Sequence, residues 1–208
     1  MEILYRNFDD IKETLYTMPD ESLLGLLKNI YSEEDAYYIL KYIMDENALK
    51  EISANPNDFF KSPLLDEQTK KKIGLKAEKI LAALKKDIII KPLSDIDPQK
   101  VNKFVVCLDE NTDIFILAWG NSDQYSQHYL LTNQLSKDHK TTPHLTTGGK
   151  IRIKKENDNL IIKLSDMSEK AEYGKFNPRL LEKYKQKILE ALNIQFEGKL
   201  DANSLQIE

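Results

Sequence analysis

The sequence predicts an α+β protein whose helices precede its strands. The apolar residues recur at helical spacing as far as Lys86, whereas from Asp87 onward they form short β-branched runs or alternate with polar residues. Pro178 then begins one more amphipathic helix. Because helices and strands are segregated along the chain, we expect a helical N-terminal region followed by a small antiparallel β-sheet with a C-terminal helix, and no doubly wound parallel sheet.

These patterns divide the 208 residues into three parts. Residues 1–86 are predicted to form an acidic, tyrosine-rich helical region. Residues 87–197 form a β-rich domain closed by a C-terminal helix. Residues 198–208 are predicted to be a frayed tail, because they follow the last periodic segment and begin at Gly198.

Each predicted helix of the first region has an apolar stripe or a terminal signal. Ser32 is a typical N-cap, and the acids that follow it complement the helix dipole. Pro19 stops the first helix, and a Pro-containing break separates the third from the fourth. The expected helices are 8–15, 23–30, 33–45 and 66–86, and the break covers residues 55–58.

The strands of the second region are predicted from β-branched runs and alternation. Two hairpins are expected, one with its turn at 109–113 and one with its turn at 155–159. Pro92 limits the first strand, and the final helix extends from Pro178 through Leu192. The expected strands are 88–90, 104–108, 114–117, 129–131, 151–154 and 160–164.

Composition narrows the class of protein. The net charge of −4 disfavours a strongly basic nucleic-acid binder, so no nucleic-acid partner is expected. The single Cys107 excludes an intramolecular disulfide and cysteine-rich zinc sites, and its apolar strand predicts a buried side chain. No apolar run approaches the ~20 residues of a membrane span, and the first residues lack a signal-peptide pattern. We therefore expect a cytoplasmic protein, and the predominance of lysine over arginine favours a bacterial source.

The acidic part of the chain is the first candidate site. Residues 1–66 contain fourteen acidic and six basic residues and six of the ten tyrosines. Tyrosine offers a large contact area with a polar tip, so this face is predicted to bind a basic or mixed protein partner. The alternative is a solvated acidic layer whose tyrosines lie half-buried at the edge of the core. The predicted contact residues are Glu33, Glu34, Asp35, Tyr37, Tyr38 and Tyr42.

Sites for metals and cofactors are not indicated. His128, His139 and His144 have gaps that match no zinc pattern, so no metal and no cofactor are expected. The segment from Thr146 to Lys150 contains two glycines that could cradle an anion, but it lacks P-loop spacing and leads into a strand. A tight turn at the start of that strand is the simpler interpretation.

Three segments carry a partial family resemblance. They are Phe104–Asp109, His144–Gly149 and Ser168–Pro178, and over residues 103–181 the chain resembles the domain shared by plant IQM-type calmodulin-binding proteins and bacterial effector-like proteins. The family's Ser-Gly-His-Tyr element is replaced here by Ser168–Tyr173, so its histidine has no counterpart. No IQ-type motif is present. The resemblance implies a fold and favours binding over a defined reaction.

Two functions remain open at this point. The first is a non-catalytic cytoplasmic protein-interaction module, such as a bacterial adaptor or secretion-associated factor. The second is a nucleotide- or small-ligand-binding enzyme, whose groups would have to converge in one cleft. Scarcity of glycine and the lack of a cofactor motif count against the enzyme. Its site residues would be His144, Thr146, Thr147, Gly148, Gly149 and Tyr173, and the family relation predicts that His144, the glycine pair and Tyr173 lie close together.

Overall fold

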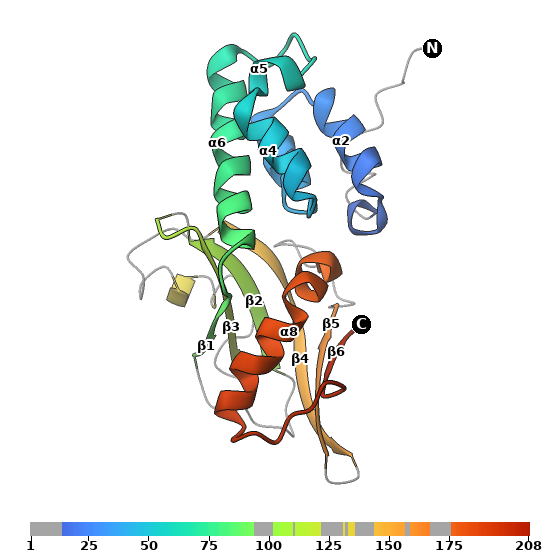
Figure 1. Ribbon diagram of the computed structural model, residues 1–208, viewed down its shortest axis with the longest axis vertical. Helices are drawn as coiled ribbons and strands as arrows, with labels where there is room; N and C mark the ends of the chain where they lie inside the picture. The colour runs from blue at the N-terminus through green and yellow to red at the C-terminus, as the bar shows by residue number, and fades with distance from the viewer. Residues whose placement is uncertain are drawn as a thin grey trace. The chain divides into compact units, whose positions relative to one another are not determined.

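The computed structural model describes residues 14–93, 102–109, 111–121, 131, 133–135, 144–156, 159–166 and 176–208. The chain divides into two compact units, Met1–Ala82 and Ala83–Glu208. The first is helical and the second contains the sheet and the last long helix (Figure 1). The α+β class and the order of helices before strands are therefore confirmed.

The helices of the first unit begin where the sequence places capping residues. The Ser32 hydroxyl accepts a hydrogen bond from the Asp35 N–H at 3.1 Å, and the Asp66 carboxylate accepts one from the Thr69 N–H at 2.7 Å. Such bonds satisfy N–H groups that have no partner within the helix. The elements are η1 Leu15–Thr17, α2 Asp20–Lys28, α3 Glu33–Leu40, α4 Glu46–Ala54, α5 Pro56–Phe59 and α6 Glu67–Leu84.

Two predicted boundaries in this unit are wrong. Helix α3 ends at Leu40, and Asp45 caps a further helix, α4, by accepting from the N–H groups of Asn47 and Ala48. The break expected at 55–58 is a short helix, α5, because Pro56 occupies a first-turn position that needs no N–H donor. The helix predicted at 8–15 lies almost wholly outside the described residues; Leu15 belongs to η1.

The sheet of the second unit has six strands in the order β1-β3-β2-β4-β5-β6. The four central strands pair antiparallel, as predicted. The two edge strands correct the prediction, because β1 is parallel to β3 and β6 is parallel to β5. Two parallel strands need a connection that brings the chain back to the end of the sheet where the first strand began. Strand β2 makes this return between β1 and β3, and helix α8 makes it between β5 and β6. The strands are β1 Ile89–Pro92, β2 Asn102–Asp109, β3 Ile114–Asn121, β4 His144–Glu156, β5 Asn159–Ser165 and β6 Leu205–Ile207.

The end of the chain also differs from the prediction. Residues 198–208 are not a frayed tail: they turn at Gly198, where φ is +77°, and then add β6 to the sheet. The backbone of Glu208 donates to the Leu164 carbonyl at 2.8 Å, and Leu205 is buried. Three residues are too few to show a period-two pattern, so only the pairing with β5 reveals this strand. A second correction concerns Leu131, which was expected in a strand and is helical.

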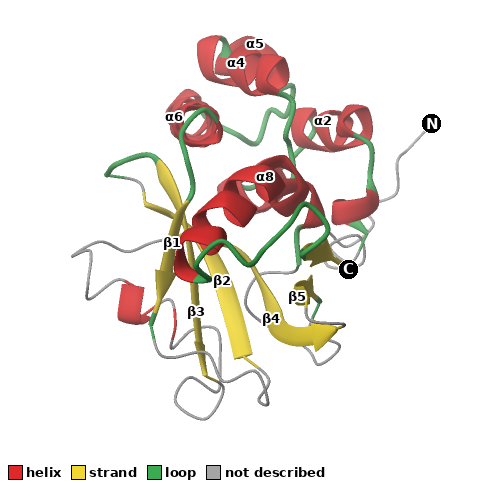
Figure 2. Ribbon diagram, turned by 60° about the horizontal axis from the view of Figure 1, so that its bottom comes forward, coloured by secondary structure: helices red, strands yellow, loops and turns green. Residues whose placement is uncertain are grey.

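Helix α8 Pro178–Gln195 covers one face of the sheet (Figure 2). The Phe104 ring meets Phe176 edge to face at 6.5 Å, and Phe115 meets Tyr184 at 5.8 Å. On the other face, alternate residues of β2 and β3 pack with helical Leu131 and Leu135. Strands β2 and β3 are therefore buried on both sides, which explains their continuous apolar runs. Cys107 is fully buried between the sheet and these two leucines, as expected.

Candidate functional site

The residues predicted to bind a partner lie on and just after helix α3. Ala36, Ile39 and Leu40 are buried and direct one side of the helix into the first unit. The opposite side carries an exposed Glu34 and the half-buried side chains of its neighbours. We call this side the α3 surface and define it as Glu33, Glu34, Asp35, Tyr37 and Tyr38.

Tyr42 does not belong to the α3 surface. Only 1% of it is exposed, and it is among the largest fully buried side chains. Since α3 ends at Leu40, the helical spacing that relates Tyr38 to Tyr42 no longer holds there. The two rings still contact each other, with centroids 6.0 Å apart, so the buried Tyr42 packs beside the half-exposed Tyr38.

The charges at α3 are partly compensated by helix α6. The Tyr37 hydroxyl donates to Glu33 Oε1 at 2.7 Å, and Lys72 Nζ lies 3.7 Å from Glu33 Oε2. Composition alone makes residues 1–66 one acidic region and does not reveal this compensation, because Lys72 lies beyond them, in α6. Predicting that the lysines of α6 face the acids of α3 would have required knowing that the two helices pack together.

Lys76 is the most unusual charged residue near this surface. Only 8% of it is exposed, and its Nζ lies 5.7 Å from the centroid of the Tyr37 ring. Burial, together with the nearby charges of Lys41 and Lys79, lowers the pKa of Lys76 to about 8. Burial and the hydrogen bond to the Glu33 carboxylate raise the pKa of Tyr37 well above its ordinary value. The composition of the sequence held no signal for either shift.

We expect these two groups to give the protein an unusual stability profile at alkaline pH. Between pH 8 and 10 the unfolded chain keeps the Lys76 proton that the folded chain has lost, so the free energy of unfolding should rise with pH. Above about pH 10 the unfolded Tyr37 loses its proton while the folded one keeps it, so the free energy should fall again.

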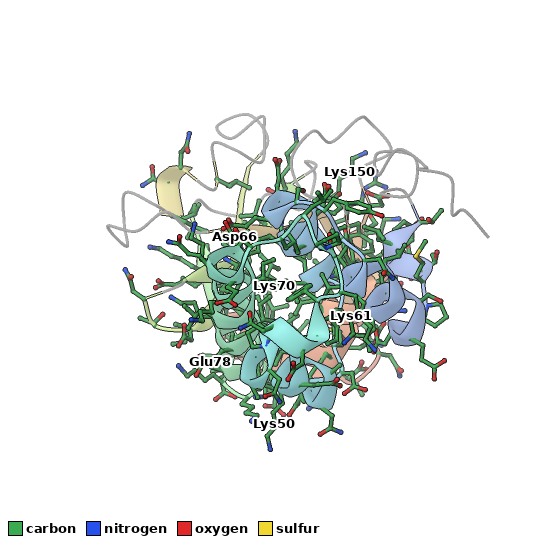
Figure 3. All side chains as sticks on the ribbon, turned by 90° about the horizontal axis from the view of Figure 1, so that it is seen from above. Lys50, Lys61, Asp66, Lys70, Glu78 and Lys150 are labelled. Atoms are coloured by element: carbon green, nitrogen blue, oxygen red, sulfur yellow. The ribbon has the colours of Figure 1, made fainter. Side chains whose placement is uncertain are left out.

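Lys76→Met is expected to abolish the rise between pH 8 and 10 and to stabilise the protein at pH 7 by on the order of 2 kcal/mol. Urea unfolding across this pH range measures both effects. The exposed Lys50 on α4, labelled in Figure 3, gives the control Lys50→Met, which should keep the wild-type profile. A rise that persists in Lys76→Met would contradict the assignment.

The alternative ligand site is not an open turn. Gly148 and Gly149 lie inside β4, paired with Val105 and Phe104 of β2, so the turn predicted at the start of the strand is wrong. Thr147 is buried, and its hydroxyl accepts from the Asn177 N–H at 2.7 Å, next to the start of α8.

The role of Thr147, Gly148 and Gly149 is therefore structural: they pair and pack within the sheet. A Cβ on Gly149 would meet the Ser165 carbonyl at 2.3 Å and the Phe104 ring at 2.9 Å, so the glycine is required for close packing. The side chains of His144 and Thr146, and all of Tyr173, lie outside the described residues. The predicted closeness of His144 and Tyr173 stays a prediction.

The turn between β2 and β3 has the structural role that its composition predicted. Asp109 accepts a hydrogen bond from the Asn111 N–H at 3.0 Å, and Asp113 adopts a positive φ of 50°.

In the part of the chain that the structure describes, no three His, Cys, Asp or Glu side chains gather as ligands of one metal ion. None of the helices in the described ranges is long and apolar enough to cross a bilayer.

Comparison of the sequence and the structure with known proteins does not assign this chain to a family. No family model matches the sequence, and no curated protein or solved structure matches it either.

Proposed function

We propose that this chain is a non-catalytic protein-interaction module and that its partner binds the α3 surface. We further propose that it acts in a bacterial cytoplasm as an adaptor or secretion-associated factor. The observation that carries the proposal is the position of Tyr37 and Tyr38, which are adjacent on α3 and both remain half-buried at the surface. Aromatic rings in this position offer contact area that a partner can cover.

The charges around the two rings favour a partner with basic groups. Glu34 is exposed and Asp35 is half-buried, and no described salt bridge involves either carboxylate. Lys41 Nζ lies 5.3 Å from the Tyr38 ring centroid, which places a cation beside the acids. A partner of mixed charge with an excess of basic groups therefore fits, and its association should weaken with salt. Covering one ring contributes about 1–3 kcal/mol to binding.

The test compares two variants with matched changes. One carries Tyr38→Ser and Glu34→Gln on the α3 surface. The other carries Tyr16→Ser and Glu51→Gln, which replace a half-buried tyrosine in η1 and an exposed glutamate on α4. Both should retain the helical circular dichroism of the wild type, since none of the four side chains is buried.

Affinity purification from the native host then tests whether a partner binds the α3 surface. We expect at least one protein to be retained by the wild type and by the Tyr16→Ser, Glu51→Gln control and to be lost from the α3 variant. Salt should elute it. Identical sets of retained proteins in all three samples, or the absence of any specific partner, would refute the proposal.

A further inference from the structure

The face of the sheet opposite α8 carries a row of cations on β4 and its two neighbours. Strand register places Lys103 of β2 directly opposite Lys150 of β4, and Arg152 of β4 directly opposite Lys163 of β5. Lys154 follows on the same face of β4, since residues two apart point to the same side. We call Lys103, Lys150, Arg152, Lys154 and Lys163 the cationic sheet face; Lys150 is labelled in Figure 3.

This face is open where β4 and β5 form it. Arg152 and Lys154 are exposed and Lys150 and Lys163 are half-buried. The alternate residues Ile151 and Ile153 are buried on the α8 side. The layer that contains Leu131 and Leu135 packs on Val105, Cys107, Ile116 and Ala118 of β2 and β3.

Two like-charged pairs directly opposite each other weaken a sheet. Side chains in such positions have Cβ atoms about 4.5–5.5 Å apart, and like charges there are destabilising. The other cross-strand neighbours of these cations within the described strands are Gly120, Ser165, Ile161 and Gln206, and none of them is acidic. Like charges opposite each other are thus tolerated on this face, as expected of a charged surface retained for binding.

The structure also shows what kind of group this face holds. Glu208, which follows β6, places its Oε1 2.8 Å from Lys163 Nζ. That hydrogen bond, with the charges of Lys163, Lys154 and Arg152, lowers the pKa of the Glu208 carboxyl. A polypeptide carboxylate at the edge of the face is thus stabilised by three of its five cations.

We propose that the cationic sheet face binds an acidic polypeptide segment, whose carboxylates occupy further positions equivalent to that of Glu208. Charge complementarity and the bound Glu208 carboxylate favour this partner. A single-stranded nucleic acid fits less well, because the residues of β2 to β6 on this face within the described ranges include no aromatic ring on which a base could stack. The proposal concerns the second unit and is independent of the α3 surface.

The test uses a fluorescent oligoglutamate peptide and an oligouridylate of equal charge, each titrated with the full chain at low salt. The main variant carries Lys150→Glu and Arg152→Glu, which turn both like-charged pairs into opposite-charged pairs. We expect its affinity for oligoglutamate to fall about tenfold or more. Its Tm should rise by about 1–4 °C, because the cross-strand repulsion has been replaced by attraction. Opposite signs for binding and stability distinguish a binding surface from a structural one.

Three further variants complete the test. Lys185→Glu, which changes the charge on α8, should bind oligoglutamate like the wild type. Arg152→Gln with Lys154→Gln should bind several-fold more weakly, and it replaces the main variant if that one does not fold. Glu208→Gln should bind about two- to threefold more tightly, because it removes the carboxylate that competes for Lys163.

Several results would overturn the proposal. They are no binding of oligoglutamate by the wild type, tighter binding of oligouridylate than of oligoglutamate, or equal losses in Lys185→Glu and in the sheet variants. Loss of binding that is accompanied by a lower Tm in both sheet variants would assign these residues to the fold and would also refute it.

Discussion

Gly149→Ala is expected to destabilise the second unit by about 3 kcal/mol or more. The new Cβ would lie 2.3 Å from the Ser165 carbonyl oxygen and 2.9 Å from Cε1 of Phe104. The first contact is with the backbone of β5, so relief requires β4 and β5 to separate. The second is with a ring already packed against Phe176, which leaves it little room to turn.

Trp119 makes this effect measurable. It is the only tryptophan of the chain, it is fully buried, and it lies opposite Phe104 in the β2–β3 pair. Its fluorescence during urea unfolding should therefore report the lower midpoint of Gly149→Ala. Gly25→Ala is the matched control: no atom lies within 4 Å of its added Cβ, and Gly25 is inside helix α2. That variant lies in the first unit and should gain about 0.5–1 kcal/mol there, measured by the loss of helical circular dichroism in urea. A Gly149→Ala protein as stable as the wild type would show that β4 does not pack as described.

Tyr42→Ser is expected to destabilise the first unit by about 3–5 kcal/mol, because it removes a fully buried ring and leaves a cavity. Tyr38→Ser should cost much less, about 1 kcal/mol, since the Tyr38 ring is half-exposed. The two residues are close in sequence and their rings are in contact, so the comparison separates burial from position.

Circular dichroism and tryptophan fluorescence together show which of the two units is destabilised. Most described residues of the first unit are helical, whereas Trp119 belongs to the second unit. In Tyr42→Ser the helical signal should therefore be lost at a lower urea concentration than in Tyr38→Ser. Equal midpoints for the two variants would place Tyr42 at the surface, contrary to the structure, and would return it to the α3 surface.

Local patterns in the sequence were sufficient to predict much of the fold. Ser32 and Pro178 mark the starts of α3 and α8 because a cap or a proline acts on residues within one turn. The β2–β3 hairpin was predicted from two apolar runs joined by a turn rich in Asp and Asn. These features depend on neighbours in the chain, so one sequence is enough to reveal them.

The candidate site depended on contacts between distant residues. Tyr37 and Tyr38 both remain half-buried, because Ala36, Ile39 and Leu40 form the buried side of α3. The burial of Tyr42, however, follows from the end of α3 at Leu40, and the burial of Lys76 follows from the packing of α6.

The same distinction applies to the sheet. Alternation along the chain predicts strands at 151–154 and 160–164, but only the register of β2, β4 and β5 places Lys103 against Lys150 and Arg152 against Lys163. Residues 205–207 are recognised as strand β6 only from their pairing with the edge of β5. Helix caps and alternation act over a few residues of chain, whereas strand partners and buried charges are decided by which distant segments pack together, and the sequence pattern carries no direct record of that choice.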